Sequence, residues 1–211
     1  YTNSFQCSFL GNLILSYISL LGSPINLYNI FKSSSLPLIE YIDSGLIKIS
    51  LVATIYLVLT LVFADISYGP IQARPSELLN FFAFIDPLYI IGLTLGCAIS
   101  NFYSFGLIDV IVGSLATLLS TYLMYKSKNL FVASLWPVLN CFFVASELYF
   151  LFAQPFWFNM TTIAIGEFII MTVVGYPLFK FALFKNKHFV EAMRIDKNNK
   201  TYLQKLSFTG K

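Results

Sequence analysis

Four long apolar segments limit the folds that this chain can adopt. They lie at residues 45–64, 106–125, 130–153 and 156–184, and about 20 apolar residues are enough for a helix to cross the hydrocarbon of a bilayer. Only 11% of the residues are charged, whereas soluble domains average about 25%. The sequence therefore predicts an all-α integral membrane protein.

Two shorter apolar segments complete a predicted bundle of six transmembrane helices. Residues 76–85 and 88–101 are too short to cross about 30 Å of hydrocarbon at 1.5 Å per residue, so we expect other helices to shield them. Gly92 and Gly96 form a small-xxx-small pair, which permits close approach of a neighbouring helix. Pro137 is expected to kink the fifth helix.

The chain divides into three predicted parts. Residues 1–44 form a leader or an extra helix without an assigned role, residues 45–184 form the six-helix membrane domain, and residues 185–211 form a basic tail in water. No basic segment precedes the apolar run 9–21, so we do not expect a signal peptide there.

Basic residues set the expected orientation. In a six-helix topology they cluster on one side, which the positive-inside rule makes cytoplasmic. We therefore expect a plasma-membrane protein with a cytoplasmic C-terminus. The clustered residues are Lys32, Lys48, Lys126, Lys128, Lys185, Lys187, Arg194 and Lys197.

The cysteine and histidine content excludes several kinds of site. Cys7, Cys97 and Cys141 have no C-x-x-C spacing, so we interpret them as small apolar residues rather than metal ligands. The single histidine, His188, lies in the tail, which excludes a histidine-based metal site or a Ser-His-Asp triad within the membrane. The basic tail lacks the interleaved aromatic residues of nucleic-acid binding. We therefore expect no metal, no nucleic acid and no catalytic residues.

Residues 63–77 are the longest polar interruption of the apolar region, and we interpret them as one wall of a cavity. Polar backbone between membrane spans is tolerated outside the lipid or around a cavity that protein lines. Arg74, in this stretch, is the one basic residue expected in the outer half of the bundle. Five carboxylates are expected there: Asp65, Glu77, Asp109, Glu147 and Glu167. Such an acidic surplus favours a cationic ligand or proton binding.

Glu147 and Glu167 are the strongest candidates for ligand binding because their neighbours in sequence are apolar. An ionisable residue at the bilayer centre costs about 2.5–3.5 kcal/mol on insertion scales, so its presence calls for a function. For Asp65 and Asp86 we favour a simpler role as helix caps. Arg74 is expected to pair with Glu77, three residues further on, and to hold the outer loop in shape.

Other polar residues are predicted at similar depth: Asn101, Asn140, Gln72 and Tyr68. Trp157 lies between two phenylalanines. This aromatic cluster is either an interfacial belt, the commoner arrangement, or a lid that stacks on a flat ring.

Several segments, in order along residues 48–180, resemble the QueT family of queuosine-precursor transporters. The matching segments are 63–77 (FADISYGPIQARPSE), 92–97 (GLTLGC), 109–117 (DVIVGSLAT), 147–149 (ELY), 155–157 (PFW) and 165–167 (IGE). The resemblance implies a six-helix substrate-binding S component of an energy-coupling-factor (ECF) transporter. Such a component captures a vitamin-like molecule outside the cell and topples in the membrane to deliver it, together with a shared membrane subunit and two ATPases.

The resemblance also implies the ligand, a queuosine precursor of the 7-deazaguanine type. Carboxylates would accept its N–H groups, an amide or Arg74 would contact its carbonyl, and an aromatic ring would stack on its plane. The predicted substrate-binding residues are Glu147, Glu167, Asp109, Asn101, Arg74, Glu77, Gln72, Tyr68, Asn140 and Trp157. The chain contains no G-x-x-x-x-G-K-[ST] motif, so we expect no cofactor in this chain and ATP hydrolysis by the partners.

S components often meet the shared subunit through an Ala-x-x-x-Ala face on the first span. The matching stretch here has Ala53 but carries Leu57 in place of the second alanine.

Two alternatives use the same carboxylates. A self-sufficient secondary transporter of a small cationic or nucleobase-like solute would couple them to protons; inverted halves would favour it, and the sequence has no convincing internal repeat. A membrane enzyme with paired carboxylates is the third possibility, but the chain lacks a histidine cluster and a nucleophile motif.

Overall fold

A computed structural model describes residues 37–104 and 106–196, with side chains from residue 45 onward. The chain divides into two compact units, residues 1–42 and residues 43–211, and every contact given below belongs to the second. Most of the predicted leader, residues 1–36, lies outside the described residues.

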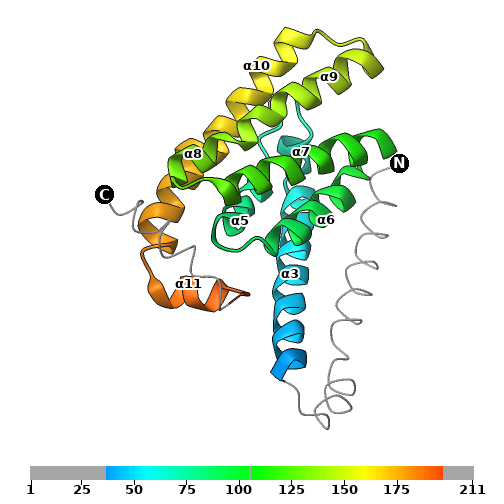
Figure 1. The fold of residues 1–211 in the computed structure, drawn as a ribbon. Coiled ribbons are helices and arrows are strands. Elements are labelled where there is room, and N and C mark those ends of the chain that lie inside the picture. Colours follow the sequence, from blue (N-terminus) through cyan, green and yellow to red (C-terminus); the bar gives the residue numbers. More distant parts are fainter. Residues whose placement is uncertain (1–36, 105, 197–211) are drawn as a thin grey trace. The chain divides into compact units, whose positions relative to one another are not determined.

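The described residues form helices joined by short turns, without a strand (Figure 1). The all-α prediction is therefore confirmed. The α-helices are α3 (Pro37–Val62), α4 (Ala64–Ser67), α5 (Phe81–Ile85), α6 (Tyr89–Asn101), α7 (Leu107–Lys126), α8 (Leu130–Leu135), α9 (Asn140–Phe152), α10 (Phe156–Glu167) and α11 (Lys187–Met193). Two 3-10 helices, η1 (Pro75–Asn80) and η2 (Pro137–Leu139), and two π-helices, η3 (Phe168–Gly175) and η4 (Leu178–Leu183), complete the order.

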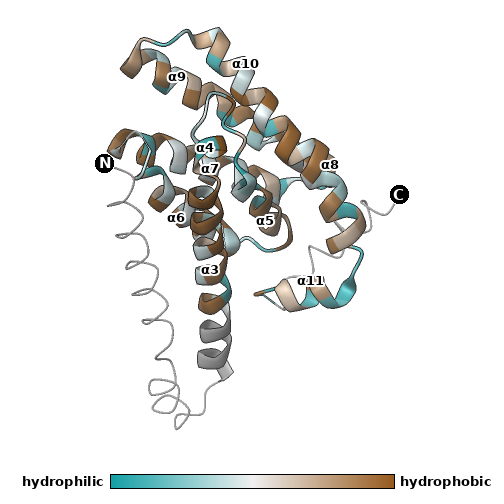
Figure 2. Cartoon of the chain, turned by 180° about the vertical axis from the view of Figure 1, so that it is seen from behind, coloured by the Kyte–Doolittle hydropathy of each residue, from teal (hydrophilic) through white to brown (hydrophobic). Residues whose placement is uncertain are grey.

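Four helical stretches of the described chain are long and apolar enough to cross a membrane. They are Gly45–Val62, Leu107–Lys126, Leu130–Phe152 and Phe156–Leu183. Figure 2 shows hydrophobic residues along most of α3 and α8, and hydrophilic ones in α11. The segment η1–α5 and the 13-residue α6 are shorter, so helix length alone does not establish the predicted count of six spans.

Helix α3 begins at Pro37, well before the predicted start of the first span at Gly45. A proline suits the first turn of a helix, where its missing N–H would be unpaired in any case. A single glycine, such as Gly45, lowers helix stability without ending the helix.

Contacts at the segment ends show that successive segments run in opposite directions. At one end, Arg74, just before η1, bonds to Asn101 at the end of α6. At the other end, Asp86, just after α5, accepts a hydrogen bond from the N–H of Ile195, beyond α11. The polar stretch 63–77 therefore shares one end of the bundle with the α6–α7 connection, and the α5–α6 turn shares the opposite end with the C-terminal segment.

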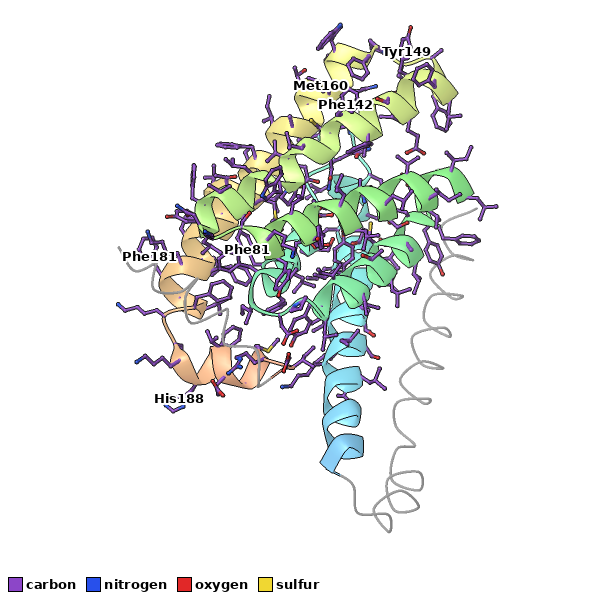
Figure 3. All side chains as sticks on the ribbon, viewed as in Figure 1. Phe81, Phe142, Tyr149, Met160, Phe181 and His188 are labelled. Atoms are coloured by element: carbon purple, nitrogen blue, oxygen red, sulfur yellow. The ribbon has the colours of Figure 1, made fainter. Side chains whose placement is uncertain are left out.

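The two short segments are packed into the bundle, as the sequence predicts. All residues of α5 are buried, and Phe81 stacks on Phe179 of η4 with ring centroids 4.6 Å apart. Figure 3 shows Phe81 enclosed among the helices, whereas Tyr149 and His188 lie at opposite ends of them. Helix α6 buries one face, at Leu93 and Cys97 among others. The shorter segments thus form the core around which the longer helices pack.

Gly92 and Gly96 allow α6 to lie directly against α3, which confirms the predicted small-xxx-small contact. A Cβ on Gly92 would lie 2.6 Å from the carbonyl oxygen of Ile49, and one on Gly96 would lie 2.8 Å from that of Ala53. Tyr56, one turn further along α3, is fully buried. The stretch from Ala53 to Tyr56 therefore faces the chain's own helices at these two positions.

Prolines and π-helical turns interrupt the two longest spans. Helix α8 ends at Leu135, and Pro137 opens the 3-10 turn η2 before α9 begins, so the predicted break at Pro137 is present. The last span changes from α-helix to π-helix directly after Glu167.

The described part of the predicted tail, up to residue 196, folds back onto the bundle, and residues 197–211 lie outside the described residues. The ammonium group of Lys48 donates to the carbonyl oxygens of Ala192 (2.6 Å) and Arg194 (2.8 Å). The Tyr89 hydroxyl donates to the Met193 carbonyl (2.5 Å). Asp86 accepts from Ile195 N–H (2.9 Å), and in addition from the N–H groups of Leu88 (3.0 Å) and Asp196 (2.7 Å). We call residues 187–196 the C-terminal clamp.

Replacing Asp86 by Asn should release the C-terminal clamp. Asp86 is buried, and its carboxylate accepts hydrogen bonds from backbone N–H groups. In the asparagine variant one of these acceptor oxygens is replaced by an NH₂ group, which cannot accept them. Loss of such charged hydrogen bonds costs about 1.5–3 kcal/mol. We expect a lower unfolding temperature in detergent and faster tryptic cleavage after Lys187 and Arg194. The exposed Asp65 provides the matched control, Asp65→Asn; equal cleavage rates in both variants would contradict the clamp.

Candidate substrate-binding site

Arg74 is the centre of the polar interior at the end of the bundle that holds residues 63–77. Its side chain is buried. Its Nη1 donates to Asn101 Oδ1 (2.9 Å), and its Nε donates to the carbonyl oxygen of Ser67 (3.2 Å). The guanidinium also lies over the ring of Tyr68, 5.4 Å from the centroid. An arginine is always protonated in proteins, so these contacts fix a permanent positive charge inside the bundle.

Asn101 connects Arg74 to α7. Its amide nitrogen donates to the backbone carbonyl of Asp109 (3.2 Å), and a Cβ on Gly113 would overlap that nitrogen. Glycine at position 113 therefore lets α6 and α7 close around the amide. Asn101 and the first turn of α7 are held as one unit, which positions Asp109 near Arg74.

Tyr68 fastens the loop before η1 to the end of α6. Its hydroxyl donates to the carbonyl oxygen of Ser100 (2.6 Å). Burial raises the pKa of Tyr68 to about 12, so the phenol remains protonated and able to donate at neutral pH. Gln72, in the same loop, is buried with a left-handed backbone (φ 46°). The loop then passes α10 so closely that a Cβ on Gly166 would overlap the carbonyl of Ile71.

Glu77 has hydrogen-bond partners other than the one that the sequence suggested. Its carboxylate accepts from the Tyr56 hydroxyl (2.5 Å) and from the Asn80 amide. Arg74 interacts with it electrostatically, but no ion pair between the two is present among the described contacts. Glu77 therefore joins η1 to α3, whereas Arg74 holds the loop through Ser67, Tyr68 and Asn101.

Asp109, Glu147 and Glu167 are buried carboxylates with unpaired oxygens. Their side chains are 2%, 6% and 6% exposed. Within the described residues, Asp109 Oδ2, both oxygens of Glu147 and Oε2 of Glu167 have no hydrogen-bond partner. A buried charge without a partner is costly, so these oxygens are the outstanding unexplained groups of the interior.

All three carboxylates interact electrostatically with Arg74. Glu147 interacts electrostatically with Asp109 and Arg74, and Glu167 interacts with Glu77 and Arg74. The sequence placed these carboxylates in the outer half of the bundle, and the structure brings them to the end where Arg74 lies. Four acidic side chains interact with one arginine, so the carboxyl groups outnumber the basic groups here, and those without a partner can accept hydrogen bonds from a donor-rich ligand.

Asn140 and Trp157 lie apart from this cluster. Asn140 lies on α9 about two turns before Glu147, and its amide donates to Ser120 (3.3 Å). Trp157, at the start of α10, is 72% exposed. It contacts Phe156 edge to face, with ring centroids 5.2 Å apart. The exposed position of Trp157 agrees better with an aromatic belt at the membrane interface than with a lid over a ligand.

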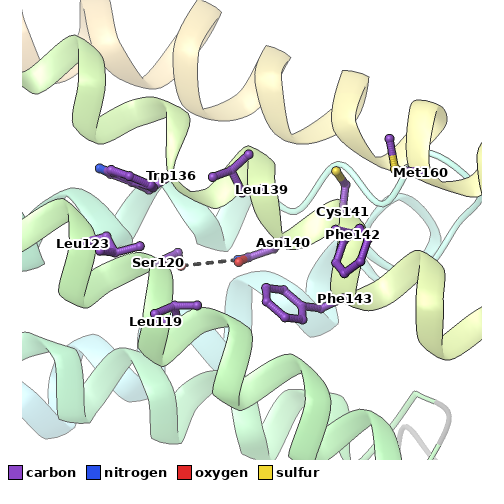
Figure 4. Close-up of a pocket in the computed structure, with 10 residues that line it drawn as sticks. All are labelled: Leu119, Ser120, Leu123, Trp136, Leu139, Asn140, Cys141, Phe142, Phe143 and Met160. Carbon is purple, nitrogen blue, oxygen red and sulfur yellow. Dashed lines mark hydrogen bonds between the residues drawn. The ribbon is translucent and has the colours of Figure 1, made fainter.

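Two hollows on the described helices are lined by residues other than the carboxylates. One, of about 470 Å³, lies between α7, α9 and α10 and includes Asn140 (Figure 4). The other, of about 620 Å³, lies at the α9–α10 end and includes Trp157 and Tyr149. The sequence suggested a water-accessible acidic pocket, whereas Asp109, Glu147 and Glu167 are enclosed by packed helices. Access to them requires movement of these helices.

Sequence reasoning missed Tyr56, Asn80 and Cys97. Asn80 is the only amide in the short apolar segment 76–85, and a polar residue in such a segment is a signal of a buried polar contact. Cys97 accepts from Thr117 (3.2 Å) and Asn101 (3.5 Å). Cys97 and Cys141 are free and buried, and no group of His, Cys, Asp and Glu in the described chain is arranged to hold a metal ion.

Comparison with known proteins identifies the family. A profile of the QueT transporter family matches residues 46–183. The queuosine precursor transporter QueT of Lactococcus lactis subsp. cremoris (strain MG1363) is 38% identical over 152 residues, which cover 64% of this chain and 90% of that protein. No solved structure matches. With its membrane-spanning helices, the chain is an integral membrane protein that belongs to the QueT transporter family, a family of transporters and not of enzymes.

Proposed function

We propose that this protein is the substrate-binding S component of an ECF-type importer and that it captures a queuosine precursor of the 7-deazaguanine type. The name of the Lactococcus lactis relative supports the substrate class. The observation that carries the proposal is the set of unpaired buried oxygens on Asp109, Glu147 and Glu167. They are acceptors, so their natural partner is a ligand rich in N–H donors.

The 7-deazaguanine class has the complementary chemistry. Its ring presents N–H donors along one edge, and its aminomethyl form carries an ammonium group. Glu147, with both oxygens unpaired, can accept two donors from such an edge. Glu167 and Asp109 then neutralise the positive charge. Arg74 already donates to Asn101 and to the Ser67 carbonyl, so it acts as a positioning residue. Its positive charge also balances part of the negative charge of the carboxylates.

The contacts at the opposite end of the bundle support a cytoplasmic C-terminus in the plasma membrane. Lys48, at the start of the first span, bonds to the C-terminal clamp at Ala192 and Arg194, so these two basic regions lie on one side. The positive-inside rule assigns that side to the cytoplasm. With η1–α5 and α6 counted as two short spans of opposite direction, the chain has six spans. The carboxylates then lie at the outer end of the bundle.

Energy would come from partners. The chain contains no phosphate-binding loop, so a shared membrane subunit and two ATPase subunits would power release of the ligand. The Ala53 face of α3, the expected docking surface, packs against Gly96. Docking would therefore use another face of the bundle.

A proton-coupled secondary transporter is the alternative, favoured by the same buried carboxylates. Uptake in proteoliposomes separates the two functions. The S component should accumulate a radiolabelled 7-deazaguanine precursor only when the shared subunit, the ATPases and ATP are present, and it should co-purify with them. Accumulation by the protein alone under a proton gradient would overturn the ECF assignment and support the carrier.

A further inference from the structure

The hollow between α7 and α9 has walls suited to an apolar guest. Leu119 and Leu123 of α7 face Trp136 and Phe142 across it (Figure 4). Its two polar wall residues, Asn140 and Ser120, hydrogen-bond to each other. The other wall residues are mainly apolar, so the hollow offers few groups to a polar ligand. Its volume of about 470 Å³ lies within the range of small-molecule sites.

The hollow opens on the surface that the bilayer covers. Leu119, Leu139 and Phe142 are 45%, 56% and 55% exposed, and all belong to stretches long enough to span the membrane. Water is absent from the hydrocarbon region. A hydrocarbon chain of the bilayer is therefore the guest that this environment supplies.

One end of the hollow carries positive charge. Trp136 Nε1 donates to the hydroxyl of Ser127 (2.7 Å), which places the α7–α8 turn at that end. Ser127 lies between the exposed Lys126 and Lys128. The Lys126 ammonium also lies 5.4 Å from the ring centroid of Tyr122. Leu119 precedes Lys126 by about 10 Å along the helix, a short reach from a headgroup into the hydrocarbon.

We propose that this hollow binds one acyl chain of an anionic phospholipid whose phosphate lies against Lys126 and Lys128. Basic sites between membrane helices on the cytoplasmic side recognise anionic headgroups in this way. The site is separate from the carboxylates, and it requires only that the protein lies in a bilayer. It would therefore stand even if the ECF assignment failed.

Native mass spectrometry of the purified protein with added phosphatidylglycerol or phosphatidylcholine tests the headgroup contact. The double variant Lys126→Gln/Lys128→Gln should retain about tenfold less phosphatidylglycerol than the unmodified protein. Lys185→Gln/Lys187→Gln, the matched control with the same change of charge, should retain it fully. Equal retention of both lipids by the unmodified protein, or equal retention by the two double variants, would overturn the proposal.

The acyl-chain contact has its own pair of variants. Leu119→Trp fills the hollow from an exposed position and so leaves the core intact, whereas Leu115→Trp adds the same bulk one turn away on α7, outside the hollow. We expect phosphatidylglycerol retention to fall about tenfold in the first and to stay unchanged in the second. Full retention by Leu119→Trp would place the lipid elsewhere and would refute the site even if the lysine variants lost binding.

Discussion

Purified Glu147→Gln and Glu167→Gln variants are expected to bind a 7-deazaguanine precursor about 10- to 100-fold more weakly than the unmodified protein. Glutamine keeps the size of each side chain but removes its charge and replaces one acceptor oxygen with a donor. A donor-rich ligand would then meet an N–H group where it needs an acceptor. Glu147 should show the larger effect, because both of its oxygens lack a partner among the described residues.

Isothermal titration calorimetry in detergent measures this loss. Asp65→Asn is the matched control, since Asp65 is an exposed carboxylate close to the same end of the bundle. It should bind as tightly as the unmodified protein. Unfolding temperatures of all three variants show whether the folded state survives. Unchanged affinity in both glutamine variants would remove these residues from the binding site.

Arg74→Met is expected to lower the free energy of unfolding by about 3–6 kcal/mol, because it removes two buried hydrogen bonds from a charged donor, each worth about 1.5–3 kcal/mol. The change leaves Asn101 Oδ1 and the Ser67 carbonyl without their donor. It also removes the cation with which Glu77, Asp109, Glu147 and Glu167 interact electrostatically. Arg74→Lys should recover only part of the loss, because an ammonium group cannot reproduce the planar fork of donors.

A double-mutant cycle identifies the source of that loss. If Arg74 stabilises the bundle by balancing the carboxylates, adding Glu167→Gln should restore part of the stability that Arg74→Met removes. Thermal unfolding in detergent gives the comparison, with Lys185→Met as a control for removal of an exposed charge. Additive effects of the two changes would contradict the electrostatic coupling and leave only the hydrogen bonds as the role of Arg74.

The helices and one close contact between helices could be predicted from local features of the sequence. Apolar length predicted where the long spans lie, and the spacing of Gly92 and Gly96 predicted a close helix contact. These features depend on the backbone and on residues a few positions apart, so a single sequence reveals them. The number of membrane crossings is harder to predict, because two of the six predicted spans are too short to be identified as transmembrane helices by their hydropathy.

The partners of the polar side chains could not be predicted in the same way. Glu77 bonds to Tyr56 and Asp86 bonds to Ile195, pairs that are far apart in the sequence and meet only after the helices pack. Asn140 and Trp157 lie on the same helices as Glu147 and Glu167 but about two turns or more away along the helix axis, so sharing a predicted span does not bring these side chains to the carboxylates. The composition predicted an acidic interior, and the structure was needed to show which carboxylates lack partners.

Mass spectrometry of small molecules retained by the purified protein is the most direct measurement of what the buried carboxylates hold. The unmodified protein should release, on denaturation, a stoichiometric 7-deazaguanine-type base, and Glu147→Gln should release far less of it. A retained ligand without N–H donors, or equal retention of the base by the Glu147→Gln variant, would contradict the assignment of these carboxylates to the substrate.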